Sequence, residues 1–209
     1  MRKYFCGGII LLLLFSVMVS DANALNWRTH QLTCITNNNA VNARAGERQL
    51  SFDISSGTEW ADSASAVSFK FYNRGTAPMT VTRIVFDFPN GVNWIGGGMG
   101  DFQNGVLAFD FVNSPQTALP GWNNIVPSFH NDFELSASYG LKPGQMFNAH
   151  FYLNMPVYNI ENAINTGAFK VGFYANSFAN GGNESFASVP EPLTALLLGL
   201  GGIFLRNRK

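Results

Sequence analysis

The sequence is short of charge and has no excess of either sign. Only 12% of its 209 residues are charged, and 13 basic side chains balance 13 acidic ones. Without a basic excess, the chain has no electrostatic attraction to nucleic acid. A hydrophobic content of 46%, with 19 Phe, is not that of a disordered protein. We therefore expect a globular chain that is long enough to bury one sizeable core.

Cysteine is equally scarce. The two cysteines are Cys6 and Cys34, and Cys6 falls in a segment that we expect to be removed. No intramolecular disulfide is then possible, so the core must supply the stability. The Cys34 thiol has two interpretations, burial as a small apolar residue or a cross-link between two chains.

The first 24 residues have the layout of an export signal. Arg2 and Lys3 form a positive start, and the apolar run 6–19 follows. Ala22 and Ala24 then supply the small residues of a cleavage site. We predict that signal peptidase cleaves after Ala24. The alternative is an uncleaved N-terminal anchor.

The last 21 residues have a second three-part layout. In order, they contain Pro190, Glu191 and Pro192, an apolar run over 193–205, and the basic residues Arg206, Arg208 and Lys209. Because a proline cannot continue a helix backwards, we expect the apolar helix to begin at Leu193. The basic end acts as a stop-transfer signal, because cations resist crossing a bilayer.

Together these features resemble the PEP-CTERM sorting signal of bacterial exported proteins. The resemblance implies that an exosortase recognises residues 189–209 of an inner-membrane anchored precursor. It further implies delivery to the cell surface or to an extracellular matrix or biofilm that contains exopolysaccharide. The run of 13 residues departs from the usual pattern. As a helix it would span about 20 Å, less than a bilayer core of about 30 Å. An unprocessed C-terminal anchor is the alternative.

Between the two ends we predict one domain, residues 25–178, and a linker rich in Asn, Gly and Ser, residues 179–188. Residues 25–188 contain 8 of the 13 basic side chains and 11 of the 13 acidic ones, a net charge of about −3. Several turns here, at 73–75, 119–121, 141–145 and 181–186, also resemble those of PEP-CTERM ectodomains. Such a mildly acidic module has no electrostatic reason to bind an anionic membrane.

Alternation of apolar and polar residues predicts strands along this domain. The alternating segments are 50–54, 67–71, 84–88, 107–111, 129–135, 147–153 and 169–175. One apolar and one polar face per strand indicates antiparallel sheets packed on each other. We predict an all-β ectodomain, an antiparallel β-sandwich of jelly-roll or immunoglobulin-like type. The one helix that we expect covers Ile160–Thr166, with Asn159 as its cap and Gly167 as its stop.

No catalytic, cofactor or zinc motif is present. Ser128, His130, Asp132 and Glu134 share one face of a predicted strand. Side chains two positions apart on a strand are roughly 6.5–7 Å apart, too far for hydrogen bonds of about 3 Å within a catalytic triad. We interpret them as a solvated polar face. A secreted hydrolase would need carboxylates or histidines that converge in the fold.

Two binding sites are still possible. Asp101, Asn104 and Asp110 offer oxygen ligands for calcium, although turn formation explains them equally well. The glycines of 96–100 lack the lysine of a phosphate loop and are interpreted as a mobile strand connection. Trp94 and Trp122 lie near predicted turns and are candidate sugar contacts, with core packing as the other interpretation.

The sequence therefore favours a non-enzymatic exported surface or matrix protein that is associated with exopolysaccharide. Its alternative is a carbohydrate-binding module or adhesin.

Overall fold

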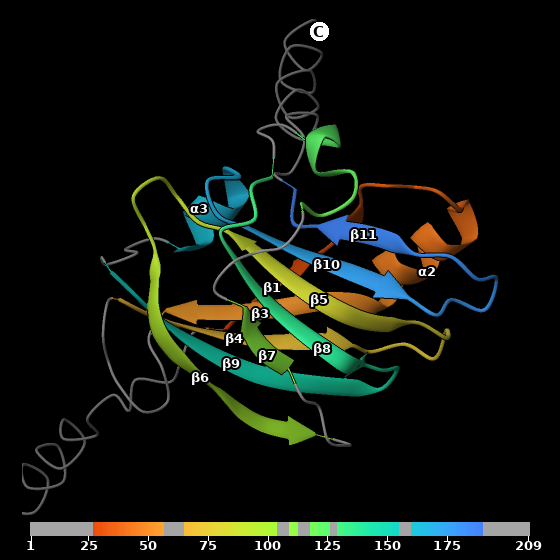
Figure 1. Cartoon of the computed structure of the whole chain (residues 1–209), viewed down its shortest axis with the longest axis horizontal. Coiled ribbons are helices and arrows are strands. Elements are labelled where there is room, and N and C mark those ends of the chain that lie inside the picture. Colours follow the sequence, from red (N-terminus) through yellow and green to blue (C-terminus); the bar gives the residue numbers. More distant parts are fainter. Residues whose placement is uncertain are drawn as a thin grey trace, which may run out of the picture.

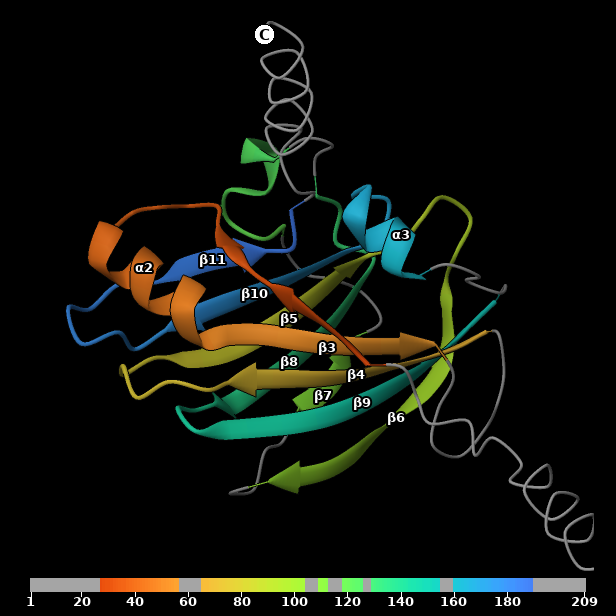
Figure 2. The same ribbon diagram turned by 180° about the vertical axis from the view of Figure 1, so that it is seen from behind.

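The computed structural model describes residues 27–56, 65–103, 109–112, 118–125, 129–154 and 160–189, and it consists mainly of two antiparallel β-sheets (Figure 1). Figure 2 shows the first sheet from outside. In spatial order, this five-stranded sheet contains β1 (Arg28–Gln31), β3 (Leu50–Ser56), β4 (Ala66–Asn73), β9 (Gln145–Leu153) and β6 (Trp94–Gln103). The six-stranded sheet contains β2 (Thr33–Cys34), β11 (Glu184–Ala187), β10 (Lys170–Asn176), β5 (Thr80–Asp87), β8 (Phe133–Leu141) and β7 (Phe109–Val112).

The space between the sheets is filled mainly by phenylalanine. Phe69 and Phe71 on β4 meet Phe86 on β5, with ring centroids 5.4 Å and 6.0 Å apart. From β9, Phe151 reaches the same ring at 4.9 Å in an edge-to-face contact. These side chains are fully buried, and each contributes about 1.5–3 kcal/mol by leaving water. The predicted all-β class is confirmed, because alternate residues from both sheets meet in this inner core.

A second, smaller cluster lies on the outer face of the six-stranded sheet. A loop, residues 118–125, crosses that face and buries Leu119 and Ile125 against Val85 and Ala187. Gly172 on β10 makes this contact possible. A Cβ atom there would lie only 2.7 Å from Leu119 Cδ2 and 3.2 Å from Phe129 Cε2. We call this packed group the outer cluster and residues 118–125 the lid loop.

In the described part of the chain, two α-helices lie beside the sheets, one expected and one not. Helix α3 (Ile160–Asn165) begins where predicted and ends one residue earlier, and Gly167 follows it with a left-handed φ of 73°. The predicted cap, Asn159, lies outside the described residues. Helix α2 (Ala40–Gln49) contradicts the expectation of a single helix. The Asn39 side chain starts α2 by accepting hydrogen bonds from Val41 N and Asn42 N. A single 3₁₀ turn, η1 (Trp122–Asn124), lies in the lid loop.

The structure corrects three local predictions. The glycine-rich stretch expected as a connection is part of β6, and the expected linker contains β11, which is buried within the six-stranded sheet. Phe129 does not share the inner face of β8, because that strand begins at Phe133. Phe129 belongs instead to the outer cluster, on the opposite side of the sheet.

The first strands connect the two sheets. β1 pairs with β3 in the five-stranded sheet, and only Leu32 separates it from β2 in the six-stranded sheet. β2 pairs with β11, the last strand of the described chain, through Cys34 and Phe186. The N-terminal part of the domain is therefore joined directly to its C-terminal strand.

Candidate functional site

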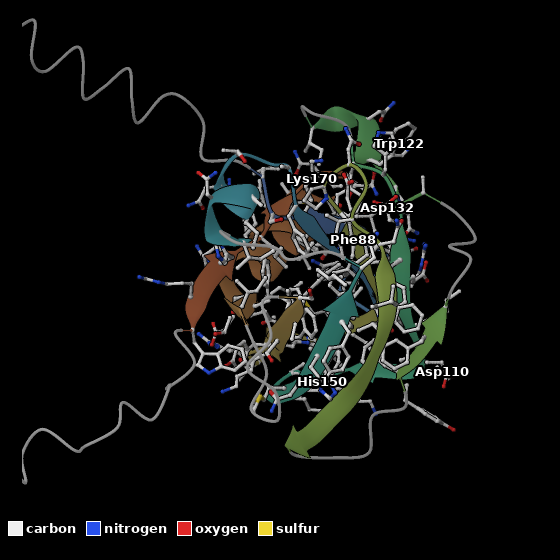
Figure 3. The ribbon with its side chains drawn as sticks, turned by 90° about the vertical axis from the view of Figure 1, so that its left-hand side faces the viewer. Phe88, Asp110, Trp122, Asp132, His150 and Lys170 are labelled. Atoms are coloured by element: carbon white, nitrogen blue, oxygen red, sulfur yellow. The ribbon has the colours of Figure 1, made fainter. Side chains whose placement is uncertain are left out.

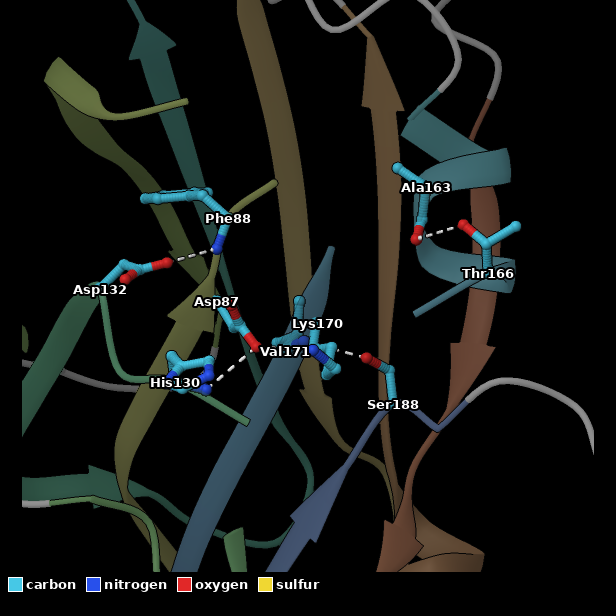
Figure 4. Close-up of polar contacts among 9 residues, drawn as sticks. All are labelled: Asp87, Phe88, His130, Asp132, Ala163, Thr166, Lys170, Val171 and Ser188. Carbon is cyan, nitrogen blue, oxygen red and sulfur yellow. Dashed lines mark hydrogen bonds and ion pairs between the residues drawn. The ribbon is translucent and has the colours of Figure 1, made fainter. Parts of the chain in front are cut away.

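A buried ion pair lies on the outer face of the six-stranded sheet, and Figure 3 labels its lysine, Lys170. Asp87 on β5 and Lys170 on β10 are opposite each other in the strand register. Lys170 Nζ is 2.6 Å from Asp87 Oδ2, and the two side chains are only 4% and 7% exposed. The His130 backbone N–H donates to the same Oδ2 over 3.0 Å, as Figure 4 shows.

Asp132 flanks this pair from the segment that leads into β8. Its Oδ2 accepts a hydrogen bond of 2.8 Å from Phe88 N, and its own N–H donates to Phe86 O. Partial burial raises the pKa of the Asp132 carboxyl, and the charge of Asp87 raises it further, although the hydrogen bond from Phe88 and the charges of His130 and Lys170 lower it. The structure therefore places two carboxylates, a lysine and a backbone donor at one end of β5.

The polar quartet that the sequence places on one strand face is separated. Ser128 lies outside the described residues, and the His130 ring is 6.1 Å from the Trp122 ring. Glu134 is held by Arg83, whose Nε and Nη2 donate to its two carboxylate oxygens at 2.7 Å and 2.8 Å. This pairing raises the pKa of Arg83. Glu134 is buried and paired, so the interpretation of these residues as a solvated polar face is wrong for Glu134.

The two tryptophans proposed as sugar contacts both take part in packing. Trp94 stacks on Phe133 at 4.8 Å and on Phe111 at 5.6 Å, at the rim of the inner core. Among the described residues, its buried indole Nε1 has no hydrogen-bond partner. Trp122 packs against the outer cluster. Both rings are partly buried, and each contacts other packed side chains.

The outer face of the five-stranded sheet has a richer set of polar and aromatic groups. Tyr72 OH donates to Asp53 Oδ2 over 2.8 Å, and the Arg74 guanidinium lies 3.9 Å from the Tyr72 ring centre. Burial, followed by the hydrogen bond to Asp53, raises the pKa of Tyr72. Farther along the face, Lys70 Nζ lies 4.0 Å from the Trp27 ring centre. The polar positions of the alternating strands were the sequence signal for this face.

His150 and Tyr152 on β9 complete that face. Their rings meet edge to face at 5.9 Å, and His150 lies across Gly98 of β6. A Cβ at Gly98 would be 2.7 Å from His150 Cε1, so the glycine makes room for the imidazole. Asn148 Oδ1 is a buried acceptor that has no hydrogen-bond partner among the described residues.

The Cys34 thiol is half-buried and donates a weak hydrogen bond to Glu184 Oε2. Burial is the main cause of the raised pKa of Cys34.

The calcium candidates are only partly described. Asp110 is exposed on β7, whereas Asn104 and the Asp101 side chain lie outside what the structure describes. Among the described residues, no group of three or more His, Cys, Asp and Glu is arranged to hold a metal ion.

The terminal predictions fall outside the described residues. These are the cleavage site at Ala22 and Ala24, the motif Pro190–Pro192, the apolar run and the basic end at 206–209. Within the part that is described, no helix is long and apolar enough to cross a membrane. No protein-family model matches the chain, and neither a curated protein nor a solved structure is similar to it.

Proposed function

We propose that the chain is a non-enzymatic exported protein of the cell surface or extracellular matrix, sorted by an exosortase through a PEP-CTERM signal. The observation that carries the proposal is the ordered C-terminal layout, with Pro190, Glu191 and Pro192 before an apolar run and a basic end. The signal-like N-terminus with Ala22 and Ala24 supports it.

The last described residues of the folded domain adjoin the proposed sorting signal. Ser188 N donates to Val171 O, and Val189 packs against the outer cluster. The last described strand, β11, ends at Ala187, before the proposed signal of residues 189–209.

The double substitution Pro190→Ala and Pro192→Ala tests the sorting proposal. We expect the precursor to accumulate in the membrane fraction at a larger mass than the mature protein. Pro78→Ala, which changes an exposed proline within the domain, is the matched control and should leave processing unchanged. Normal mature size and destination in the double variant would refute the proposal.

We propose a jelly-roll arrangement for the domain. The pair β4–β9 lies in one sheet and the pair β5–β8, nested within it in sequence, lies in the other. β6 and β7 then extend the two sheets beside β9 and β8. This nesting supports a jelly roll over the immunoglobulin-like alternative.

Carbohydrate binding is the second candidate function, and its proposed site is the outer face of the five-stranded sheet. Tyr72, His150 and Tyr152 provide partly exposed rings, and Asn148 provides the unpartnered acceptor. Aromatic rings suit the apolar faces of sugars, and side-chain amides suit their hydroxyls. Trp94 and Trp122 have smaller roles in this proposal because both are engaged in packing.

Retention on exopolysaccharide purified from the producing bacterium tests this second candidate. His150→Ala and Tyr152→Ala should each weaken retention, whereas Tyr139→Ala should not. Tyr139 is 70% exposed on β8 of the other sheet and so serves as a matched surface control. Equal retention of all three variants would place any binding elsewhere.

A further inference from the structure

The pair formed by Lys170 and Asp87 differs from an ordinary surface ion pair in two respects. Both side chains are almost fully buried, and they lie on adjacent strands whose register fixes them opposite each other. An amine nitrogen 2.6 Å from a carboxylate oxygen is already at contact distance from the carboxyl group. Fixed neighbours of this kind react far faster than the same groups in solution.

We propose that Lys170 and Asp87 form an intramolecular amide bond, so that a covalent cross-link joins β10 to β5. The proposal is independent of the sorting signal. It assigns this pair a chemical role in a domain whose described part contains one cysteine and no disulfide.

The bond-forming step balances without a co-reactant. A proton passes from Lys170 Nζ to the Asp87 carboxylate and comes to lie on Oδ1, which gives a neutral amine and a carboxylic acid whose carbonyl oxygen is Oδ2. Nζ then attacks Cγ, an Nζ–Cγ bond forms and the Cγ–Oδ1 bond breaks. The departing hydroxyl takes a second proton from the nitrogen and leaves as water, and nothing is oxidised or reduced.

The surrounding backbone suits this reaction. Negative charge develops on Oδ2 when the amine adds to Cγ, and the His130 N–H already points at that oxygen over 3.0 Å. A fixed backbone donor at such a position stabilises the tetrahedral intermediate. Asp132 anchors the same end of β5 through Phe88 N, as Figure 4 shows, and through Phe86 O. These contacts hold the Asp87 carboxyl group against the Lys170 amine.

A second ion pair, which is less deeply buried, provides an internal comparison. Arg83 and Glu134 also come from adjacent strands and bond at 2.7 Å. A guanidinium keeps its proton at all ordinary pH values and is not a nucleophile, so this pair can form only a salt bridge. The structure thus holds one pair that can condense and one that cannot.

Intact mass measurement of the full chain, produced in an exporting bacterium and folded before analysis, tests the proposal. We expect the protein to be lighter than its sequence by one water, about 18 Da, whichever termini processing leaves. Lys170→Arg keeps the positive charge and should show the full sequence mass. Lys170→Met should do the same, and Glu134→Gln should retain the water loss.

Peptide sequencing separates a cross-link from other dehydrations. A digest should give a peptide containing Asp87 linked to one containing Lys170, and the link should be absent from both Lys170 variants. Asp87→Asn should still form the link, now with loss of ammonia, about 17 Da. A wild-type protein of full mass, or a water loss confined to an unlinked Asp87 peptide, would overturn the proposal.

Discussion

The inner core and the outer cluster lie on opposite faces of the same six-stranded sheet, yet they are built in different ways. The inner core combines phenylalanines from regularly alternating strands of both sheets, such as Phe71 and Phe173. The outer cluster depends on one irregular loop, the lid loop, which fits over Gly172. Regular alternation along the strands thus builds the inner core, whereas the outer cluster can pack only because Gly172 has no side chain.

The largest effect is expected in the inner core. Phe69→Ala removes a ring that contacts Phe86, Phe151 and Phe169. We expect a loss of about 3–5 kcal/mol in the free energy of unfolding, because a fully buried ring leaves a cavity. Urea unfolding followed by circular dichroism measures it. A loss below about 1 kcal/mol would mean that the two sheets do not depend on this contact.

A smaller and more local effect is expected in the outer cluster. Gly172→Ala places a Cβ 2.7 Å from Leu119 Cδ2, and we expect a loss of about 1–3 kcal/mol from overpacking. Hydrogen exchange should accelerate most at the amides of Trp122 and Phe129, which donate hydrogen bonds within the loop region.

Gly96→Ala is the matched control, because a Cβ there meets nothing within 4 Å. It should leave exchange in the lid loop unchanged. If Gly172→Ala slowed hydrogen exchange in the lid loop or left it unaltered, packing of the lid loop would not depend on the absence of a side chain at Gly172.

The smallest effect concerns pH. The raised pKa of Asp132 means that the folded protein favours its protonated form. The stability from this group is therefore fully present below its unfolded pKa of about 3.9 and is lost as pH rises through the higher folded value. Asp132→Asn keeps an oxygen for Phe88 N but cannot ionise. Its melting temperature relative to wild type should rise between pH 3 and pH 7, and a constant difference would show that burial does not raise the pKa of Asp132.

Much of the fold could be predicted from the sequence where alternation is strict. Phe147, Ala149 and Phe151 alternate with polar residues, and their strand was predicted correctly. The predicted linker failed because Glu184 and Ser185 are polar, yet both are buried beside Phe186. Glu184 is accommodated by hydrogen bonds from Asn38 N, Asn39 N and Thr36 Oγ1, partners about 145 residues away that no local pattern shows.

The candidate sites were less accessible to sequence reasoning. Asp87 and Lys170 lie 83 positions apart, and only the pairing of β5 with β10 brings them together. Helix α2 was missed because it has no clear apolar stripe. Its exposed Val41 and its cap Asn39 were the only local cues. The outer polar face of the five-stranded sheet was implied by alternation, but its grouping of Tyr72 with Asp53 required the register.

The pairing of β2 with β11 has a consequence for the order of folding. Thr33 and Cys34 find their strand partners at Ala187 and Phe186, so the six-stranded sheet cannot be completed until almost the whole domain has been synthesised. Contacts over such long sequence separations make folding slow. If the chain is exported as proposed, this late closure of the sheet would keep it unfolded for longer, and an unfolded chain is the form that a narrow export channel can thread.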